Sequence, residues 1–342
     1  MKSNSVIRKI LAVCICLILL YGCGHDENKL DKVDVSGIKV NLKVHRFDKA
    51  LFAIPPDSIS SNIPKLEKEF GEFFNLFCAR IINIGGSNSR DFEILLKKYV
   101  SDYNMLTVYN DCNKNFDNVS EITNNLASGF KYYKSYFPKK NIPEIYFFMG
   151  GFNKSIVTSE NILGIGLERY LGTNYSYYPR LGLAAYQSYR MQKEFIVPDC
   201  FRAIAWADYQ YNDSIDDLIH QMIYQGKVQY FIDAMLPELP DTVKFAYSKS
   251  QWDWCVANEK TMWSYLIDNK QLFITGEMDV KRYIDDAPFT TMFPHDSPGR
   301  TGVWMGWKIV SNYMKNHPEI SLEKLMKENN YEVILDGSKY NP

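Results

Sequence analysis

The first 23 residues constrain this chain more than any other segment. Three cations precede an apolar run of about eleven residues, 10–20, and Gly22-Cys23 follows it. A membrane-spanning helix needs ~20 apolar residues, so this run is too short to cross a bilayer and has the layout of a cleavable signal peptide. An ordinary secretory signal would end in an A-x-A-like site, which is missing here. We therefore expect a lipoprotein signal peptide over residues 1–22 and a lipid on Cys23.

The expected lipid determines where the rest of the chain works. Two or more acyl chains hold a protein stably on a membrane, so we expect an anchor in the cell envelope, on the inner or the outer membrane. Residues 23–37 are polar and acidic, which is typical of a tether. No later stretch is apolar for long enough to span a bilayer. Residues 38–342 are expected to form a single globular domain that faces the periplasm or the cell surface.

The charge of the chain argues against nucleic acid as a partner. The chain has 39 basic and 40 acidic residues, and three of the basic ones belong to the signal segment. The mature protein is therefore acidic, and it contains no basic run of the kind that contacts phosphate backbones. Nucleic acid is not an expected partner.

Four cysteines remain once the signal segment and the lipidated residue are set aside: Cys78, Cys112, Cys200 and Cys255. They are far apart and lack the C-x-x-C spacing of metal sites. Four cysteines allow three pairings, and nothing in the sequence selects one. Disulfides and buried free thiols both stay open at this point.

Periodicity predicts an α+β fold. Alternating residues over 38–47 predict a half-buried strand, 145–149 a buried strand, and 155–158 with 162–167 a hairpin. Apolar residues at helical spacing predict helices over 60–77, 91–101, 121–137, 214–234, 251–268 and 301–316. Asp213 or Ser214 is the expected cap of the fourth helix. The fold class is thus a small mixed β-sheet in the N-terminal half packed by a largely helical C-terminal half.

Glycine spacing adds two expectations about packing. Gly302 and Gly306 lie four residues apart on the last of these helices and would let another element approach its backbone closely. Gly164 and Gly166 lie within a predicted strand, where they indicate a bulge or a close contact.

The common catalytic motifs are missing. The sequence has no G-x-S-x-G elbow, no phosphate-binding G-x-x-x-x-G-K-[ST] loop and no H-E-x-x-H, and its five histidines never fall four residues apart. We therefore expect no catalytic residue, no metal and no cofactor. His220 is interpreted as a satisfied helix histidine, whereas His295 lies in a Pro- and Gly-rich loop, where functional residues concentrate.

Acidic residues receive structural interpretations, with one exception. Asp216-Asp217 is expected at a helix N-terminus, where the dipole favours acids, and Asp285-Asp286 in a solvated turn. Glu259 lies on the apolar face of its helix and is expected either to be buried with a partner or to lie at the edge of a pocket. Arg300 is the candidate partner.

Several sequence blocks, in order, carry a resemblance to a known family. They are the Gly22-Cys23 signal, LIHQMIYQGK at 218–227, Trp254-Cys255 with Asn258-Glu259, APFT at 287–290, SPGRTGVWMGWKIV at 297–310 and SKYNP at 338–342. Together they resemble the gliding-motility lipoprotein GldB family of Bacteroidota, over nearly the whole mature chain. The resemblance implies a role in gliding and in the associated secretion and surface machinery.

That family also resembles zinc-dependent proteases, which use H-E-x-x-H and a later Glu-Gly pair. The resemblance would place Ala205 and Tyr209 at the zinc-binding histidine positions and Gln225 at the carboxylate position. A methyl group or a phenol cannot replace an imidazole ligand, so zinc hydrolysis would be lost. The implied fold is a degenerate zincin-like domain with a vestigial pocket. The candidate pocket residues are His220, Gln225, Glu259, His295, Arg300 and Tyr340.

Two hypotheses from different classes follow. The first is a non-catalytic, membrane-anchored accessory protein that binds envelope, motility or secretion proteins and is not an enzyme. The second is a membrane-anchored, protease-like hydrolase with a noncanonical site around His220, Glu259 and His295. A purely structural envelope lipoprotein is a third possibility.

Replacing Cys23 by alanine tests the anchor. We expect Cys23→Ala to move the protein out of the membrane fraction and to impair its function, because the variant cannot be lipidated. Fractionation of cells followed by immunoblotting measures the distribution. A variant that stays with the membranes and functions normally contradicts the assignment.

Overall fold

The described part of the chain carries one small mixed sheet. The computed structural model describes residues 33–212 and 214–342, so the predicted signal peptide, Cys23 and most of the tether lie outside the described residues. The strands are β1 (Val44–Arg46), β2 (Glu144–Phe148), β3 (Ile156–Ser159) and β4 (Ile162–Gly166), in the order β1-β2-β4-β3. β1, β2 and β4 are parallel, and β3 pairs antiparallel with β4. The predicted hairpin and the buried strand at 145–149 are confirmed.

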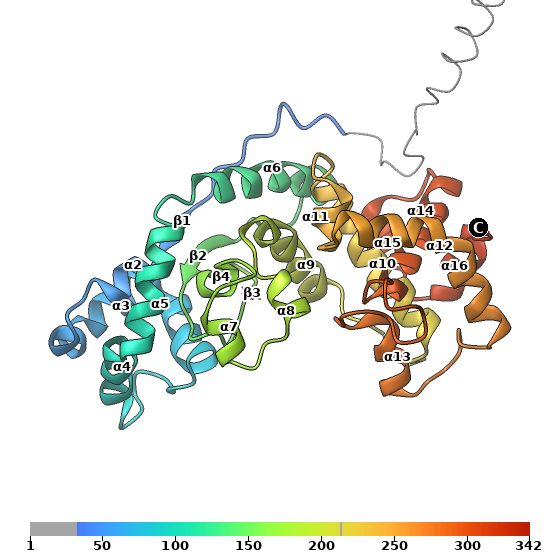
Figure 1. The fold of residues 1–342 in the computed structure, drawn as a ribbon. Helices are drawn as coiled ribbons and strands as arrows, with labels where there is room; N and C mark the ends of the chain where they lie inside the picture. Colours follow the sequence, from blue (N-terminus) through green and yellow to red (C-terminus); the bar gives the residue numbers. More distant parts are fainter. Residues whose placement is uncertain (1–32, 213) are drawn as a thin grey trace, which may run out of the picture. The chain divides into compact units, whose positions relative to one another are not determined.

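Helices make up most of the remaining structure. In the N-terminal half they are α2 (Phe47–Phe52), α3 (Ile59–Leu76), α4 (Phe92–Ser101), α5 (Tyr103–Asn115), α6 (Ser120–Tyr136), α7 (Tyr177–Arg180) and α8 (Ala185–Tyr189). They continue with α9 (Ile196–Asp208), α10 (Leu218–Met235), α11 (Asp241–Phe245), α12 (Lys249–Asp268), α13 (Glu277–Ile284), α14 (Thr301–Asn316), α15 (Leu322–Lys327) and α16 (Tyr331–Ser338). Short helical turns occupy Pro56–Ser58, Phe77–Ile81, Leu167–Tyr170 and Lys193–Phe195. The α+β class is confirmed, and α9 contacts both β3 and α10 (Figure 1).

The first strand is shorter than predicted. Pairing with β2 extends only over Val44–Arg46, and Phe47 already begins α2. The ring of Phe47 is fully buried. The predicted strand over 38–47 is therefore confirmed only for 44–46. Residues 38–43 lie outside any strand, and Phe47 begins α2, which directs its ring against the aromatic residues of α3 and the turn that follows it.

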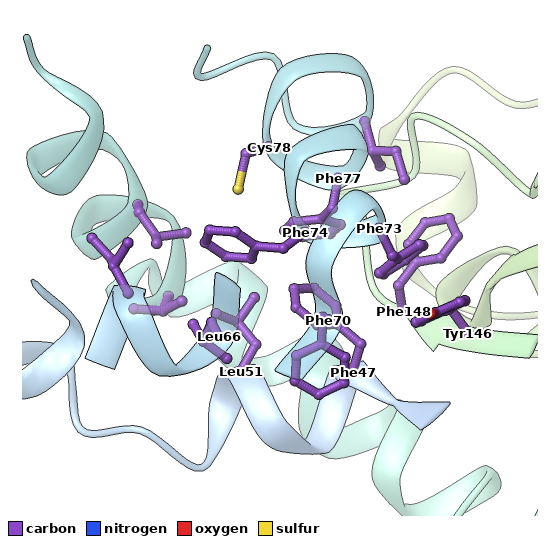
Figure 2. Close-up of a cluster of buried hydrophobic side chains, with 14 of the residues drawn as sticks. Phe47, Leu51, Leu66, Phe70, Phe73, Phe74, Phe77, Cys78, Tyr146 and Phe148 are labelled. Atoms are coloured by element: carbon purple, nitrogen blue, oxygen red, sulfur yellow. The ribbon is translucent and has the colours of Figure 1, made fainter. Parts of the chain in front are cut away.

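An aromatic cluster surrounds the ring of Phe47 (Figure 2). The Phe47 ring lies edge-to-face against Phe70, Phe73 and Phe77, with centroids 5.0, 5.2 and 4.7 Å away. Such pairs contribute about 0.5–1.5 kcal/mol each beyond their burial. α3 bends at Gly71, whose φ of 47° only glycine adopts freely, and this bend lies between Phe70 and the next two aromatic residues. The cluster therefore fixes α2 and α3 on the sheet.

α10 begins later than predicted. Its N-cap is Asp217, whose carboxylate accepts a hydrogen bond from the backbone N–H of His220 at 3.0 Å. Ser214 precedes the helix, and Asp213 lies outside the described residues. The start was misplaced because Ser and Asp are comparable N-caps, and Ile215, which lies between the expected and the observed cap, is exposed and not part of the buried helix. The predicted helices at 251–268 and 301–316 are confirmed as α12 and α14.

α10 and α14 touch through their backbones, as the glycine spacing predicted. A Cβ atom on Gly306 would overlap the carbonyl oxygen of Met222, and one on Gly226 would overlap the carbonyl of Gly306. Farther along the same interface, the indole nitrogen of Trp307 donates a hydrogen bond to Asp233 at 2.5 Å. Only glycine at both positions allows this approach.

The four described cysteines are buried free thiols. Burial raises the pKa of Cys78 to about 12 and raises that of Cys112 and Cys200 as well. The sequence left disulfides and buried free thiols both open, and in this structure the four described cysteines are free thiols. Within the described ranges, no helix combines the length and the apolar character needed to cross a membrane.

Replacing Gly306 by alanine tests the helix contact. We expect Gly306→Ala to lower the free energy of unfolding by about 3 kcal/mol or more, because backbone must move to relieve the overlap. Urea unfolding followed by circular dichroism measures the loss. Gly86→Ala is the matched control, since nothing lies within 4 Å of its added Cβ, and it should change stability by less than about 0.5 kcal/mol. Equal effects of the two variants would contradict the proposed packing.

Candidate functional site

Three arginines line one cleft beside α10. Arg202 comes from α9, Arg190 directly follows α8, and Arg300 directly precedes α14. Gln225 and Gln229 of α10 line the same cleft, which has a volume of about 150 Å³. Charged and polar groups from segments far apart in sequence therefore meet at one place.

Two carboxylates connect the guanidinium groups. Asp286, just after α13, accepts a hydrogen bond from Arg190 at 2.5 Å. It also forms an ion pair with Arg300, whose Nε lies 2.9 Å from the carboxylate. Asp199 of α9 pairs with Arg202 and lies 3.6 Å from Arg190. The result is a chain of alternating charge that runs from Arg202 to Arg300.

Backbone carbonyls and a ring also hold these side chains. Arg202 donates to the carbonyl of Lys244 at 2.8 Å, and Arg300 donates to the carbonyl of Phe245. The ring of Tyr247 lies 5.3 Å from the Arg300 guanidinium carbon, within the range of a cation–π contact. The guanidinium groups are thereby fixed in orientation.

The arginines and aspartates of the cleft shift one another's pKa values. Burial lowers the pKa of Arg202 to about 10; the carboxylate of Asp199 opposes this shift, and the charges of Arg190 and Arg300 add to it. Burial alone would raise the pKa of Asp286, but the charges of Arg300 and Arg190 outweigh it and hold that pKa below its ordinary value. A negatively charged group is therefore stabilised here.

One polar group of the cleft has no partner. Gln229 is 2 % exposed, and its side-chain Nε2 finds no hydrogen-bond acceptor in the described structure. A buried donor without an acceptor costs about 1–3 kcal/mol.

Trp206 lines the cleft as well and is 45 % exposed.

The structure distributes the six predicted pocket residues over several places. Gln225 and Arg300 share the cleft. Glu259 instead accepts a hydrogen bond from the hydroxyl of Tyr340 at 2.9 Å and lies 3.4 Å from Nζ of Lys308. Glu259 is thus engaged with a partner, as one of its two interpretations expected.

His220 and His295 lie neither in the arginine-lined cleft nor beside Glu259. His220 is buried, and its Nδ1 lies 2.6 Å from the carboxylate of Asp217, which agrees with the interpretation of a satisfied helix histidine. His295 is exposed and stacks on Phe289, with ring centroids 4.1 Å apart.

One finer expectation was wrong: Arg300 pairs with Asp286, not with Glu259. The Asp285-Asp286 turn is exposed, as expected, but Asp286 also forms ion pairs with Arg190 and Arg300. The sequence could not show these pairs because the segment after α13 brings Asp286 to two arginines that are distant in the sequence.

Sequence reasoning missed Arg190, Arg202 and Gln229. The available signal was Arg202, a charged residue within the otherwise apolar run Cys200-Phe201-Arg202-Ala203-Ile204. A buried charge is rare unless it is paired, so this position should have been singled out. Arg190 and Gln229 carry no comparable local signal.

The two residues expected at the zinc-binding histidine positions do not line the cleft, whereas Gln225, expected at the carboxylate position, does. Ala205 is fully buried, and Tyr209 follows the end of α9. From α9, Arg202 and Trp206 lie in the cleft that holds Gln225. In residues 33–212 and 214–342, no three His, Cys, Asp or Glu side chains are grouped so that they could hold a metal ion.

Comparison with known proteins gives one finding. A family model described as gliding motility protein GldB matches residues 28–342. No curated protein and no solved structure matches the chain. The expected likeness to zincin-like domains therefore stays a prediction.

Replacing Asp286 by asparagine tests the charge network. We expect Asp286→Asn to lower the free energy of unfolding by about 1–3 kcal/mol, because Arg190 and Arg300 lose their shared carboxylate; the effect stays below that of a fully buried pair since Asp286 is partly exposed. Asp285→Asn is the matched control, because burial raises the pKa of Asp285 and neutralising it should not destabilise the protein. Chemical unfolding at pH 7 compares the two variants. Indistinguishable midpoints would contradict the bridging role.

Proposed function

The chain belongs to the gliding motility protein GldB family, a family of gliding-associated lipoproteins, and on this premise we propose that it is a non-catalytic, membrane-anchored accessory protein of the gliding or secretion machinery. It acts as a binding module, and the arginine-lined cleft is its binding site. Cys23 holds this module on an envelope membrane, beside the proteins it serves.

The charge of the cleft carries the proposal. Gln225, the residue that the family resemblance places at a metal-ligand position, lies among Arg190, Arg202 and Arg300. Guanidinium groups repel a divalent metal ion and attract anions. A cleft of this kind suits recognition of a negatively charged group better than zinc-dependent hydrolysis.

The positions of the other candidate residues support a non-catalytic role. A hydrolase built on His220, Glu259 and His295 needs these groups within reach of one substrate. His220 lies against Asp217 and Tyr331, whereas Glu259 is hydrogen-bonded to Tyr340. The exposed His295 stacks on Phe289, and we assign no shared reaction to the three side chains.

Complementation of a deletion strain tests the proposal. We expect deletion to reduce gliding or protein secretion, and Arg202→Gln to fail to restore it, because the cleft loses a guanidinium group. Glu259→Gln should restore function, since an amide still accepts the hydrogen bond from Tyr340. Colony spreading and the secreted protein profile are the readouts.

The matched control is Arg282→Gln, which removes a charge from an exposed arginine paired only with Asp279 among the contacts described. Immunoblots of the membrane fraction verify equal amounts of each variant. Loss of function in Glu259→Gln at normal protein levels would favour the hydrolase instead. Normal gliding and secretion in the deletion strain would favour a purely structural lipoprotein.

A further inference from the structure

The ion-pair network of the cleft contains more arginines than carboxylates. Arg190, Arg202 and Arg300 share only the carboxylates of Asp199 and Asp286. Asp285 also lines the cleft, but no ion pair joins it to these arginines in the described part of the chain. Within the ion-pair network itself, three guanidinium groups therefore share two carboxylates.

The cleft also contains a buried, uncharged hydrogen-bond donor that has no acceptor among the described residues, the side-chain amide of Gln229. Gln229 is almost completely enclosed, lines the cleft, and has an amide nitrogen without a partner. Charged and neutral donors thus line one small space beside the carboxylates of Asp285 and Asp286, and none of these acceptors reaches the Gln229 amide nitrogen. An acceptor-rich ligand would satisfy both.

The donors are held ready for such a ligand. Asp199 and the Lys244 carbonyl fix Arg202 from one side, and the Phe245 carbonyl fixes Arg300. Side chains fixed before binding lose little entropy when the ligand arrives. Planar guanidinium groups match the oxygens of carboxylate and phosphate in paired hydrogen bonds.

The size of the cleft limits what enters it. A volume of about 150 Å³ is smaller than the ~300–1,000 Å³ of pockets that enclose drug-sized molecules. We propose that the cleft binds a single oxyanion group, a carboxylate or a phosphate, while the rest of the ligand stays outside. This inference deepens the proposed binding function and rests on it for its biological role.

Titration of the purified full-length lipoprotein in detergent tests the proposal. Inorganic phosphate and acetate are the two probes, and chloride at matched ionic strength is the reference, because salt alone weakens surface ion pairs. Calorimetry gives the dissociation constants. At tenfold excess over the dissociation constant, the melting temperature should rise by about 2–4 °C over the chloride reference. Tighter binding of phosphate indicates a phosphate ester as the source of the group, and tighter binding of acetate indicates a carboxylate.

Gln229→Met separates ligand binding from folding. Methionine has nearly the same shape and lacks the unpartnered donor, so the variant without ligand should melt no lower than the wild type. Its affinity for the preferred anion should fall about tenfold, which is the size expected for one hydrogen bond to a charged group. Ser311→Ala is the matched control: it removes a buried, unpartnered hydroxyl outside the cleft and should leave anion affinity unchanged.

Two results would overturn the inference. The first is that neither phosphate nor acetate binds or stabilises the protein beyond chloride. The second is that Gln229→Met binds the anion as tightly as Ser311→Ala does. If the inference fails while Arg202→Gln still abolishes function in cells, the proposed function stands and only the class of ligand is wrong.

Discussion

The backbone contact between α10 and α14 sets the geometry of the C-terminal half. Gly226 and Gly306 bring the two helices closer than any side chain would allow. Gln225 and Gln229 lie beside this contact on one helix, and Arg300 lies at the start of the other. The spacing between the glutamine donors and this guanidinium group is therefore fixed by the absence of two Cβ atoms. A site built on packed helices holds its geometry better than one built on loops.

The arginine network is positioned by the contact between α10 and α14, and burying its charges costs desolvation free energy. Removing charges from water is unfavourable, and only well-placed partners compensate. Here the partners come from α9 and from the segment after α13, together with the carbonyls of Lys244 and Phe245. Such a network contributes little net stability.

Local sequence signals predicted the elements well and the site only in part. Helical periodicity located α3, α12 and α14, and glycine spacing anticipated a close helix contact. The errors arose where tertiary contacts outweigh local pattern. Phe47 begins a helix and its ring contacts lie in the core, and the segment before α10 offers several residues that could cap it, of which only Asp217 does. Gln225 and Arg300 were named as candidates, but their neighbour Arg190 is distant in sequence and becomes adjacent only through the fold.

The burial of the four described cysteines has a consequence for the reactivity of the folded protein. Only the thiolate reacts with oxidants and disulfides. With its pKa raised to about 12, Cys78 would be ionised in roughly one molecule in 100,000 at pH 7. The other thiols are shifted in the same direction. In the folded state these four thiols should therefore react slowly with oxidants and with other disulfides, because little thiolate is present and each sulfur is buried.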